Sequence, residues 1–276
     1  YAEVAARMIA PQDTPRVRAP ITKTSHKAAV DRVTDTPGSL GIVRLAEAVE
    51  MDQVQLLSTC NLPYALDAFG AKAGENPLSR TMYLYSSNQP LPPQAEAFLS
   101  YATSPEVSNL VDLAGFVDFT VSSHAQELAA TRVRYGLREE SSAVRLDRMR
   151  ELFVDMIEWD RLSTTFRFSS SSPNLNNAAL RDIPRLAEHL ASLPAGTEVA
   201  FVGFTDSSGS FTSNVNLSRE RATSVEQQVI ALAGDAGLAD KRVVIKGYGE
   251  LNPLGCNDTE KGKQLNRRVE VWVRTG

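Results

Sequence analysis

The C-terminal part of the sequence, Arg161–Gly276, alternates strand patterns with helix patterns, and this order restricts the fold more than any other feature. Leu162, Phe166 and Phe168 share one face with Thr164 in Leu162–Phe168, and valines occupy every second position in Val269–Val273, as in strands with one buried face. Thr197–Phe204 is apolar on both faces, which is typical of a central strand. Asn214–Leu232 has the apolar spacing of a long amphipathic helix.

Two further patterns complete this order. Ala179–Leu193 has helical spacing but contains Pro184, so we expect a kink or a restart of the helix with Asp182 as its N-cap. Arg242–Tyr248 predicts another strand, and a loop and a short helix precede the last one. The predicted order is therefore β-α-β-α-β-(loop, short helix)-β, which is a mixed α/β domain.

Residues 1–122 are also predicted to be α/β. The β-forming run Arg80–Tyr85 predicts a strand. Helices are expected to begin at Pro92–Pro93 and at Ser104–Pro105, the second ending at Gly115.

Residues 123–160 are predicted to be a helical connector. Ser123 and Gln126 have the spacing of a capping box, and a second helix is expected from about Ser142. One face of this second helix is apolar and predicts packing on a neighbouring domain. The apolar face consists of Leu146, Met149, Phe153, Met156 and Ile157.

The composition excludes some classes of protein. A net charge of −4 over 276 residues, without runs of one sign, argues against a nucleic-acid-binding protein. The sequence contains no run of about 18 apolar residues, which a membrane-spanning helix requires. It opens without an initiator Met or a signal peptide, so we expect it to be the interior of something longer.

The cysteines and histidines define no catalytic or metal-binding set. Cys60 and Cys256 lie far apart in different predicted domains, and they could be paired, free or matched to cysteines elsewhere. His26, His124 and His189 are scattered along the chain. We therefore expect no metal, no cofactor and no enzymatic activity.

Asp206 and Arg221 are the two charges that the pattern singles out. Asp206 follows the end of the predicted central strand, where open α/β sheets favour ligands, and Arg221 lies about two turns into the long helix. Held apart, the carboxylate and the guanidinium suit the ammonium and the carboxylate of a zwitterionic amino acid. The pattern leaves two alternatives open, an internal Asp206–Arg221 salt bridge and a turn in which Asp206 caps a loop amide.

Four sequence blocks, in order, resemble the OmpA-like C-terminal domain over about Arg161–Gly276. They are Gly203–Gly209, Asn214–Ala222, Gly247–Pro253 and Asn257–Gly262 with Asn266–Glu270. The resemblance implies a mixed four-stranded sheet and a domain that binds the diaminopimelate-containing stem peptide of peptidoglycan. By the same matching, Asp206 contacts the ligand's amino group and Arg221 its carboxylate, and the residues around the site are Thr205, Asn214, Leu217 and Arg268.

One position departs from the pattern of the family. The family commonly has His between the Gly and the Thr of the first block, where this chain has Phe204. The departure leaves both charges in place but changes the hydrogen bonding expected around the site.

Residues 1–122 resemble the second half of a PstS-type phosphate-binding protein, a type II periplasmic solute-binding fold. The resemblance is carried by Asp35–Gly41, Asn76–Tyr85, Ala97–Tyr101, Ser104–Glu106 and Ala114–Val117. It implies phosphate or another small anion as a possible ligand of a longer protein, although the anion-holding loops of that family belong to a part preceding Tyr1.

The sequence thus predicts a non-catalytic protein of the periplasm of a Gram-negative bacterium, anchored to peptidoglycan through residues 161–276. The alternatives are a phosphate or oxyanion receptor with an accessory wall-binding module, and a scaffold that binds other envelope proteins.

Overall fold

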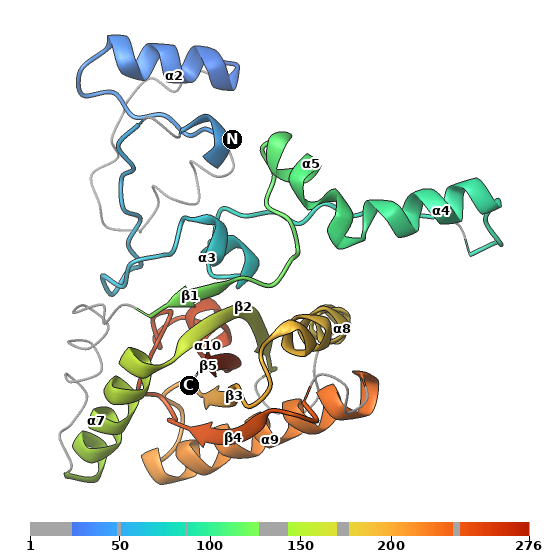
Figure 1. The fold of residues 1–276 in the computed structure, drawn as a ribbon. Coiled ribbons are helices and arrows are strands. Elements are labelled where there is room, and N and C mark those ends of the chain that lie inside the picture. The colour runs from blue at the N-terminus through green and yellow to red at the C-terminus, as the bar shows by residue number, and fades with distance from the viewer. Residues whose placement is uncertain are drawn as a thin grey trace. The chain divides into compact units, whose positions relative to one another are not determined.

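The structure, a computed structural model, forms two compact units (Figure 1). The first comprises Tyr1–Val54 and Leu78–Asp118, and the second comprises Gln55–Pro77 and Phe119–Gly276. This grouping differs from the predicted boundaries at 122 and 160, because Gln55–Pro77 belongs with the C-terminal unit. The residues described are 24–48, 51–86, 88–126, 143–169, 177–233 and 238–275.

The first unit is helical where it is described. Its elements are α2 (His26–Asp35), η1 (Leu45–Glu47), α4 (Pro93–Ala102), η2 (Pro105–Val107) and α5 (Ser108–Leu113). The helices expected at Pro93 and after Ser104 are confirmed.

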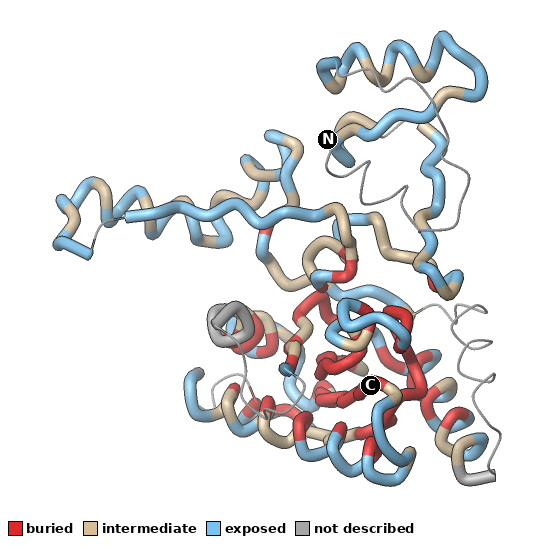
Figure 2. The backbone as a smooth tube through the Cα atoms, turned by 180° about the vertical axis from the view of Figure 1, so that it is seen from behind, coloured by how far each residue is buried: buried red, intermediate tan, exposed pale blue. Residues whose placement is uncertain are grey.

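The strand expected over Arg80–Tyr85 is wrong, since this segment has no regular secondary structure. Its side chains are exposed, with Tyr85 at 89%. Figure 2 shows few buried residues in this unit. A strand needs a hydrogen-bonded neighbour, and the described residues of this unit contain no strand to provide one. The α/β sheet of a solute-binding domain is therefore not seen here.

The second unit contains a mixed sheet with the strand order β1-β2-β5-β3-β4. β3 and β4 are parallel, and the other neighbours are antiparallel. The four predicted strands are present, and β1 adds a fifth at the edge, where Ser123 pairs with Leu162. The strands are β1 (Ser123–Ala125), β2 (Asp160–Arg167), β3 (Glu198–Phe204), β4 (Arg242–Gly247) and β5 (Arg268–Arg274).

β1 also corrects the helix predicted to begin at Ser123. The capping-box spacing is a local signal, whereas pairing with the open edge of β2 is a tertiary one, and the pairing prevails. The rest of that predicted helix, beyond Gln126, lies outside the described residues.

In the described part of this unit five helices accompany the sheet, among them α7 at the predicted position. α8 continues through Pro184, so the predicted restart at Asp182 is wrong. The helices are α3 (Ala68–Lys72), α7 (Ala143–Glu158), α8 (Asn177–Ser192), α9 (Phe211–Ala233) and α10 (Glu260–Asn266).

Alternation along β3 builds two separate cores, one on each face of the sheet. Val199 and Phe201 pack with α8 and α9, whereas Val202 and Phe204 pack with α7. Each such side chain contributes about 1.5 to 3 kcal/mol when fully buried. The buried face of α7 is rotated from the predicted apolar face, since Leu152 is buried and Ile157 is 69% exposed.

Two glycines let helix α9 lie directly against the sheet. A Cβ atom at Gly203 would be 1.9 Å from the carbonyl oxygen of Ser218, and one at Gly247 would be 2.7 Å from the Arg219 nitrogen. Any larger residue would force the helix away from the strands. This close approach brings Arg221 of α9 toward the end of β3, where Asp206 follows.

Candidate functional site

Asp206 lies two residues beyond the end of β3 and is buried. Its Oδ2 accepts a hydrogen bond from Nη1 of Arg267 at 2.8 Å, and its Oδ1 accepts one from the Ser208 amide at 2.9 Å. Burial acts to raise the pKa of Asp206, but the hydrogen bonds from Arg267 and Ser208 outweigh it and the pKa lies below its ordinary value. The site therefore presents a carboxylate that is ionised at neutral pH.

Arg221 is only 3% exposed, yet few groups satisfy its guanidinium. The group lies over the ring of Phe168, 5.2 Å from the centroid, and Nη2 is 3.5 Å from the Ser169 carbonyl oxygen. Within the part of the chain that the structure describes, Nε has no hydrogen-bond partner. Burial and the neighbouring charge of Arg267 lower the pKa of Arg221, which stays charged at neutral pH.

Among the ion pairs of the described residues, none joins Asp206 to Arg221. The internal salt bridge that the sequence left open is thus not what holds these charges. The other open alternative is present in part, because Asp206 does cap the Ser208 amide.

Arg267 is the functional residue that sequence reasoning missed. It pairs with Asp206 through Nη1 and with Glu260 through Nη2 at 2.7 Å, while its Nε has no partner. The available signal was the tandem Arg267–Arg268 just before the last strand, where one arginine could point to each side of the sheet.

The remaining predicted residues divide by exposure. Thr205 is buried, and its Oγ1 has no hydrogen-bond partner. Asn214 is also buried, and its Nδ2 donates to the Asp206 carbonyl at 3.3 Å and to Oε2 of Glu250 at 2.9 Å. Leu217, at 38% exposed, is the predicted site residue most open to solvent.

Arg268 has a different environment from the other predicted site residues. It is fully buried, with Nε 2.6 Å from Oε1 of Glu270 and Nη2 2.9 Å from the Asn252 carbonyl oxygen. Its guanidinium lies 4.1 Å from the ring centroid of Phe204. The aromatic ring at the position of the family's usual His thus packs under a buried arginine, inside the core that also contains Tyr248 and Trp272.

The site therefore combines an ionised carboxylate with buried polar atoms that lack partners. The orphan atoms are Thr205 Oγ1, Arg221 Nε and Arg267 Nε. Buried polar groups are nearly always hydrogen-bonded, and the described residues supply no partner for these three atoms. A carboxylate with a separate guanidinium suits a ligand that carries both an ammonium and a carboxylate.

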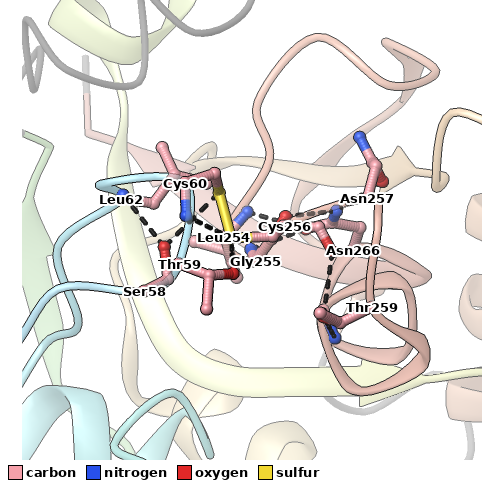
Figure 3. Close-up of a disulfide and its surroundings, with 11 residues drawn as sticks. Ser58, Thr59, Cys60, Leu62, Leu254, Gly255, Cys256, Asn257, Thr259 and Asn266 are labelled. Atoms are coloured by element: carbon pink, nitrogen blue, oxygen red, sulfur yellow. Dashed lines mark hydrogen bonds between the residues drawn. A yellow bond between two sulfur atoms is a disulfide. The ribbon is translucent and has the colours of Figure 1, made fainter. Parts of the chain in front are cut away.

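Cys60 and Cys256 form a disulfide with a Cα–Cα distance of 5.8 Å (Figure 3). Of the three possibilities left by the sequence, this is the paired one. Both cysteines belong to the second unit, although they are 196 positions apart and were predicted in different domains.

A comparison with protein families finds one match in this part of the chain. Residues 167–267 match the OmpA family. The match includes every residue of the candidate site except Arg268 and does not reach residues 1–122, so it gives the phosphate-binding resemblance no support.

Individual relatives match over similar lengths. The chain is 38% identical over 106 residues to the probable lipoprotein YiaD of Escherichia coli, covering 38% of this chain and 46% of that protein. It is 33% identical over 106 residues to the peptidoglycan-binding protein ArfA of Mycobacterium tuberculosis, covering 38% of this chain and 31% of that protein. The chain thus spans less than half the length of these relatives.

Among solved structures, the peptidoglycan-associated lipoprotein of Burkholderia pseudomallei has 22% identity and a TM-score of 0.36. The alignment covers 40% of this chain and 90% of that one.

Residues 167–267 of the chain are thus similar to the OmpA family. Within the residues described, no group of His, Cys, Asp and Glu side chains is arranged to hold a metal ion. In the same residues, no helix is long and apolar enough to cross a membrane.

Proposed function

We propose that this chain anchors to peptidoglycan by gripping the diaminopimelate group of the stem peptide between Asp206 and Arg221. The observation that carries the proposal is the buried guanidinium of Arg221, which has an orphan Nε and no ion pair with the nearby carboxylate of Asp206. Among the ion pairs of the described residues none includes Arg221, so its charge is available to a ligand carboxylate.

The charges suit the free end of diaminopimelate, which carries an ammonium and a carboxylate on the same carbon. The ammonium would bind Asp206, and the carboxylate would accept two hydrogen bonds from Arg221. Thr205 Oγ1 and Asn214 would line the site, and Leu217 would pack against the ligand. Arg268 would support the end of β3 through its contact with the ring of Phe204. That ArfA is named a peptidoglycan-binding protein supports this choice of ligand.

The expected affinity is modest. Charge-assisted hydrogen bonds contribute about 1.5 to 3 kcal/mol each, and association costs several kcal/mol in lost freedom. We expect a dissociation constant in the micromolar range or weaker, which suits a reversible anchor on a polymer with many binding sites.

The proposal locates the chain in the periplasm of a Gram-negative cell envelope. Phosphate binding by residues 1–122 stays a prediction from the sequence, because neither the described fold nor the family match supports it. The scaffold role likewise stays a prediction.

Co-sedimentation with purified sacculi tests the proposal, together with calorimetry using free meso-diaminopimelate. The parent chain should pellet with diaminopimelate-type sacculi but not with lysine-type sacculi, because lysine lacks the second carboxylate that Arg221 would bind. Asp206→Asn removes the charge and keeps one acceptor oxygen in place of the two that serve Arg267 and Ser208, so it should abolish pelleting. Equal pelleting of both sacculus types, or an Asp206→Asn variant that pellets like the parent, would refute the assignment.

A further inference from the structure

The segment Gln55–Pro77 lies outside the family match but belongs to the same compact unit as the ligand site. One end of it is fastened by the Cys60–Cys256 disulfide. Near the bond, Leu62 and Leu254 are both buried, and the Ser58 hydroxyl accepts from the Leu62 amide at 2.9 Å (Figure 3). The segment thus forms a closed turn against the loop that carries Cys256.

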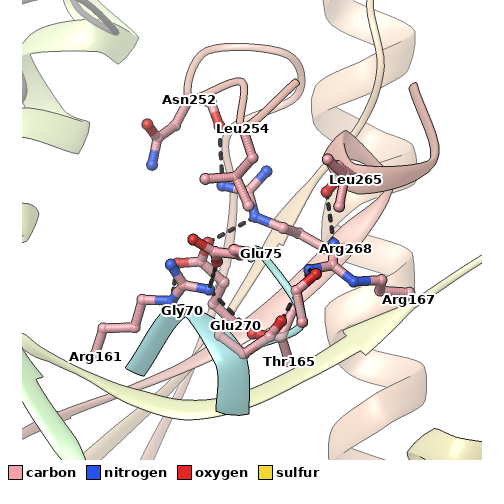
Figure 4. A network of polar contacts seen from close by, with 12 residues as sticks. Gly70, Glu75, Arg161, Thr165, Arg167, Asn252, Leu254, Leu265, Arg268 and Glu270 are labelled. Atoms are coloured by element: carbon pink, nitrogen blue, oxygen red, sulfur yellow. Dashed lines mark hydrogen bonds and ion pairs between the residues drawn. The ribbon is translucent and has the colours of Figure 1, made fainter. Parts of the chain in front are cut away.

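The other end of the segment is fastened by charge (Figure 4). Glu75 is buried and pairs with Arg161 of β2, whose Nε is 3.1 Å from Oε2 of Glu270. Arg167 donates from Nη2 to the Ala73 carbonyl at 2.9 Å. These contacts hold the segment against β2 and β5, and none of them involves Asp206 or Arg221.

A short chain of contacts connects the disulfide to the loop that carries Asp206. Asn257, next to Cys256, accepts at its Oδ1 from the Ser207 amide at 3.2 Å. The same Oδ1 accepts from Nδ2 of Asn266 at 2.8 Å. Ser207 directly follows Asp206, so the position of Asn257 bears on the position of the ligand carboxylate.

Close packing makes the Cys256 loop and α10 a single rigid piece. A Cβ atom at Gly262 would be 2.1 Å from the Cys256 carbonyl oxygen, and Oδ1 of Asn266 accepts from the Gly255 amide at 2.9 Å. Arg267 directly follows α10 and holds the Asp206 carboxylate. Both supports of Asp206, Ser207 and Arg267, therefore depend on the piece to which the disulfide is bonded.

We propose that the Cys60–Cys256 disulfide, which ties the Cys256 loop to the 55–77 segment, is a positioning element of the ligand site and fixes the Asp206 loop through Asn257. The inference rests on the proposed function, since it assigns a second part of the chain to the same site. Opening the disulfide would free Cys256 from the segment, allow Asn257 to shift and loosen the Ser207 amide. The loss of a preformed geometry lowers affinity even when every ligand-contacting side chain is intact.

The test compares three variants of the full chain at a temperature where all are folded. Cys60→Ser/Cys256→Ser removes the bond, Asn257→Ala removes the acceptor for Ser207, and Glu75→Gln removes the charge at the far end of the segment. Binding of meso-diaminopimelate is measured by calorimetry, and the Ser207 amide is followed by its NMR shift and hydrogen exchange. We expect the double cysteine variant and Asn257→Ala to bind about five- to tenfold more weakly, with a changed Ser207 amide. Glu75→Gln should bind within about twofold of the parent.

The outcomes separate this inference from the proposed function. If the parent binds no diaminopimelate, the proposed function fails, and the Ser207 amide alone decides whether the disulfide positions the loop. Unchanged binding and an unchanged Ser207 amide in the double cysteine variant would overturn the inference. Equal weakening by Glu75→Gln would overturn it too, since the effect would then be a general loss of stability.

Discussion

Replacing Arg221 by methionine separates binding from stability, because the structure predicts opposite effects on the two. Arg221 is 3% exposed, and within the described residues its guanidinium lies over the ring of Phe168 and close to the Ser169 carbonyl, with no hydrogen-bond partner at Nε. Desolvating such a charge costs several kcal/mol, which these contacts offset only in part. Methionine has a similar length, carries no charge and packs well on an aromatic ring.

We therefore expect Arg221→Met to be as stable as the parent or more stable by up to about 2 kcal/mol, as often found when buried charges become apolar. Binding should fall sharply. Two charge-assisted hydrogen bonds at about 1.5 kcal/mol each correspond to roughly a hundredfold in the dissociation constant. Urea denaturation measures the first quantity, and calorimetry with meso-diaminopimelate measures the second.

Arg219→Met is the matched control, since Arg219 is exposed on the same helix and carries the same charge. It should change neither the unfolding free energy nor the affinity by more than about 0.5 kcal/mol. The reasoning is refuted if Arg221→Met unfolds at a lower urea concentration than the parent but binds diaminopimelate with the same affinity. Arg221 would then be a structural residue.

Three further predictions follow from the same contacts. Arg267→Gln should raise the pKa of Asp206, because it weakens the hydrogen bond that most lowers this pKa and leaves the effect of burial. Since the carboxylate form is the one that binds, binding should be lost at a higher pH than in the parent as the pH falls. Calorimetry at a series of pH values measures this. Glu270→Gln leaves the fully buried Arg268 without its carboxylate and should lower the unfolding free energy by about 3 to 5 kcal/mol in urea denaturation. Gly203→Ala places a methyl group within 1.9 Å of the α9 backbone, and should cost about 3 kcal/mol or more and lower the melting temperature. An Arg267→Gln variant that loses binding at the same pH as the parent would contradict the first prediction. A melting temperature within a degree or two of the parent for Glu270→Gln or Gly203→Ala would contradict the prediction for that variant.

Local patterns in the sequence were sufficient for the strands and helices of the C-terminal domain. Apolar alternation identified β2 and β5, and helical spacing identified α9, because side-chain periodicity directly reflects which face is buried. The motif blocks also predicted Asp206 and Arg221 as the charges of the candidate site. Whether those charges pair is a question of three-dimensional distance, which spacing along the chain does not fix.

Tertiary structure decided the partners. Alternation alone would place the polar face of β5 in water, but this face is buried. Glu270 on it pairs with Arg161 of β2, and Arg161 also pairs with Glu75. Arg267 rather than Arg221 pairs with Asp206, and Cys60 reaches Cys256 across most of the chain. The sequence by itself determined the helices and strands of residues 161–276, because side-chain periodicity depends on neighbours a few residues apart. It also showed which residues carry charge. Only folding determined which of these charges pair with one another, because pairing depends on contacts between distant segments.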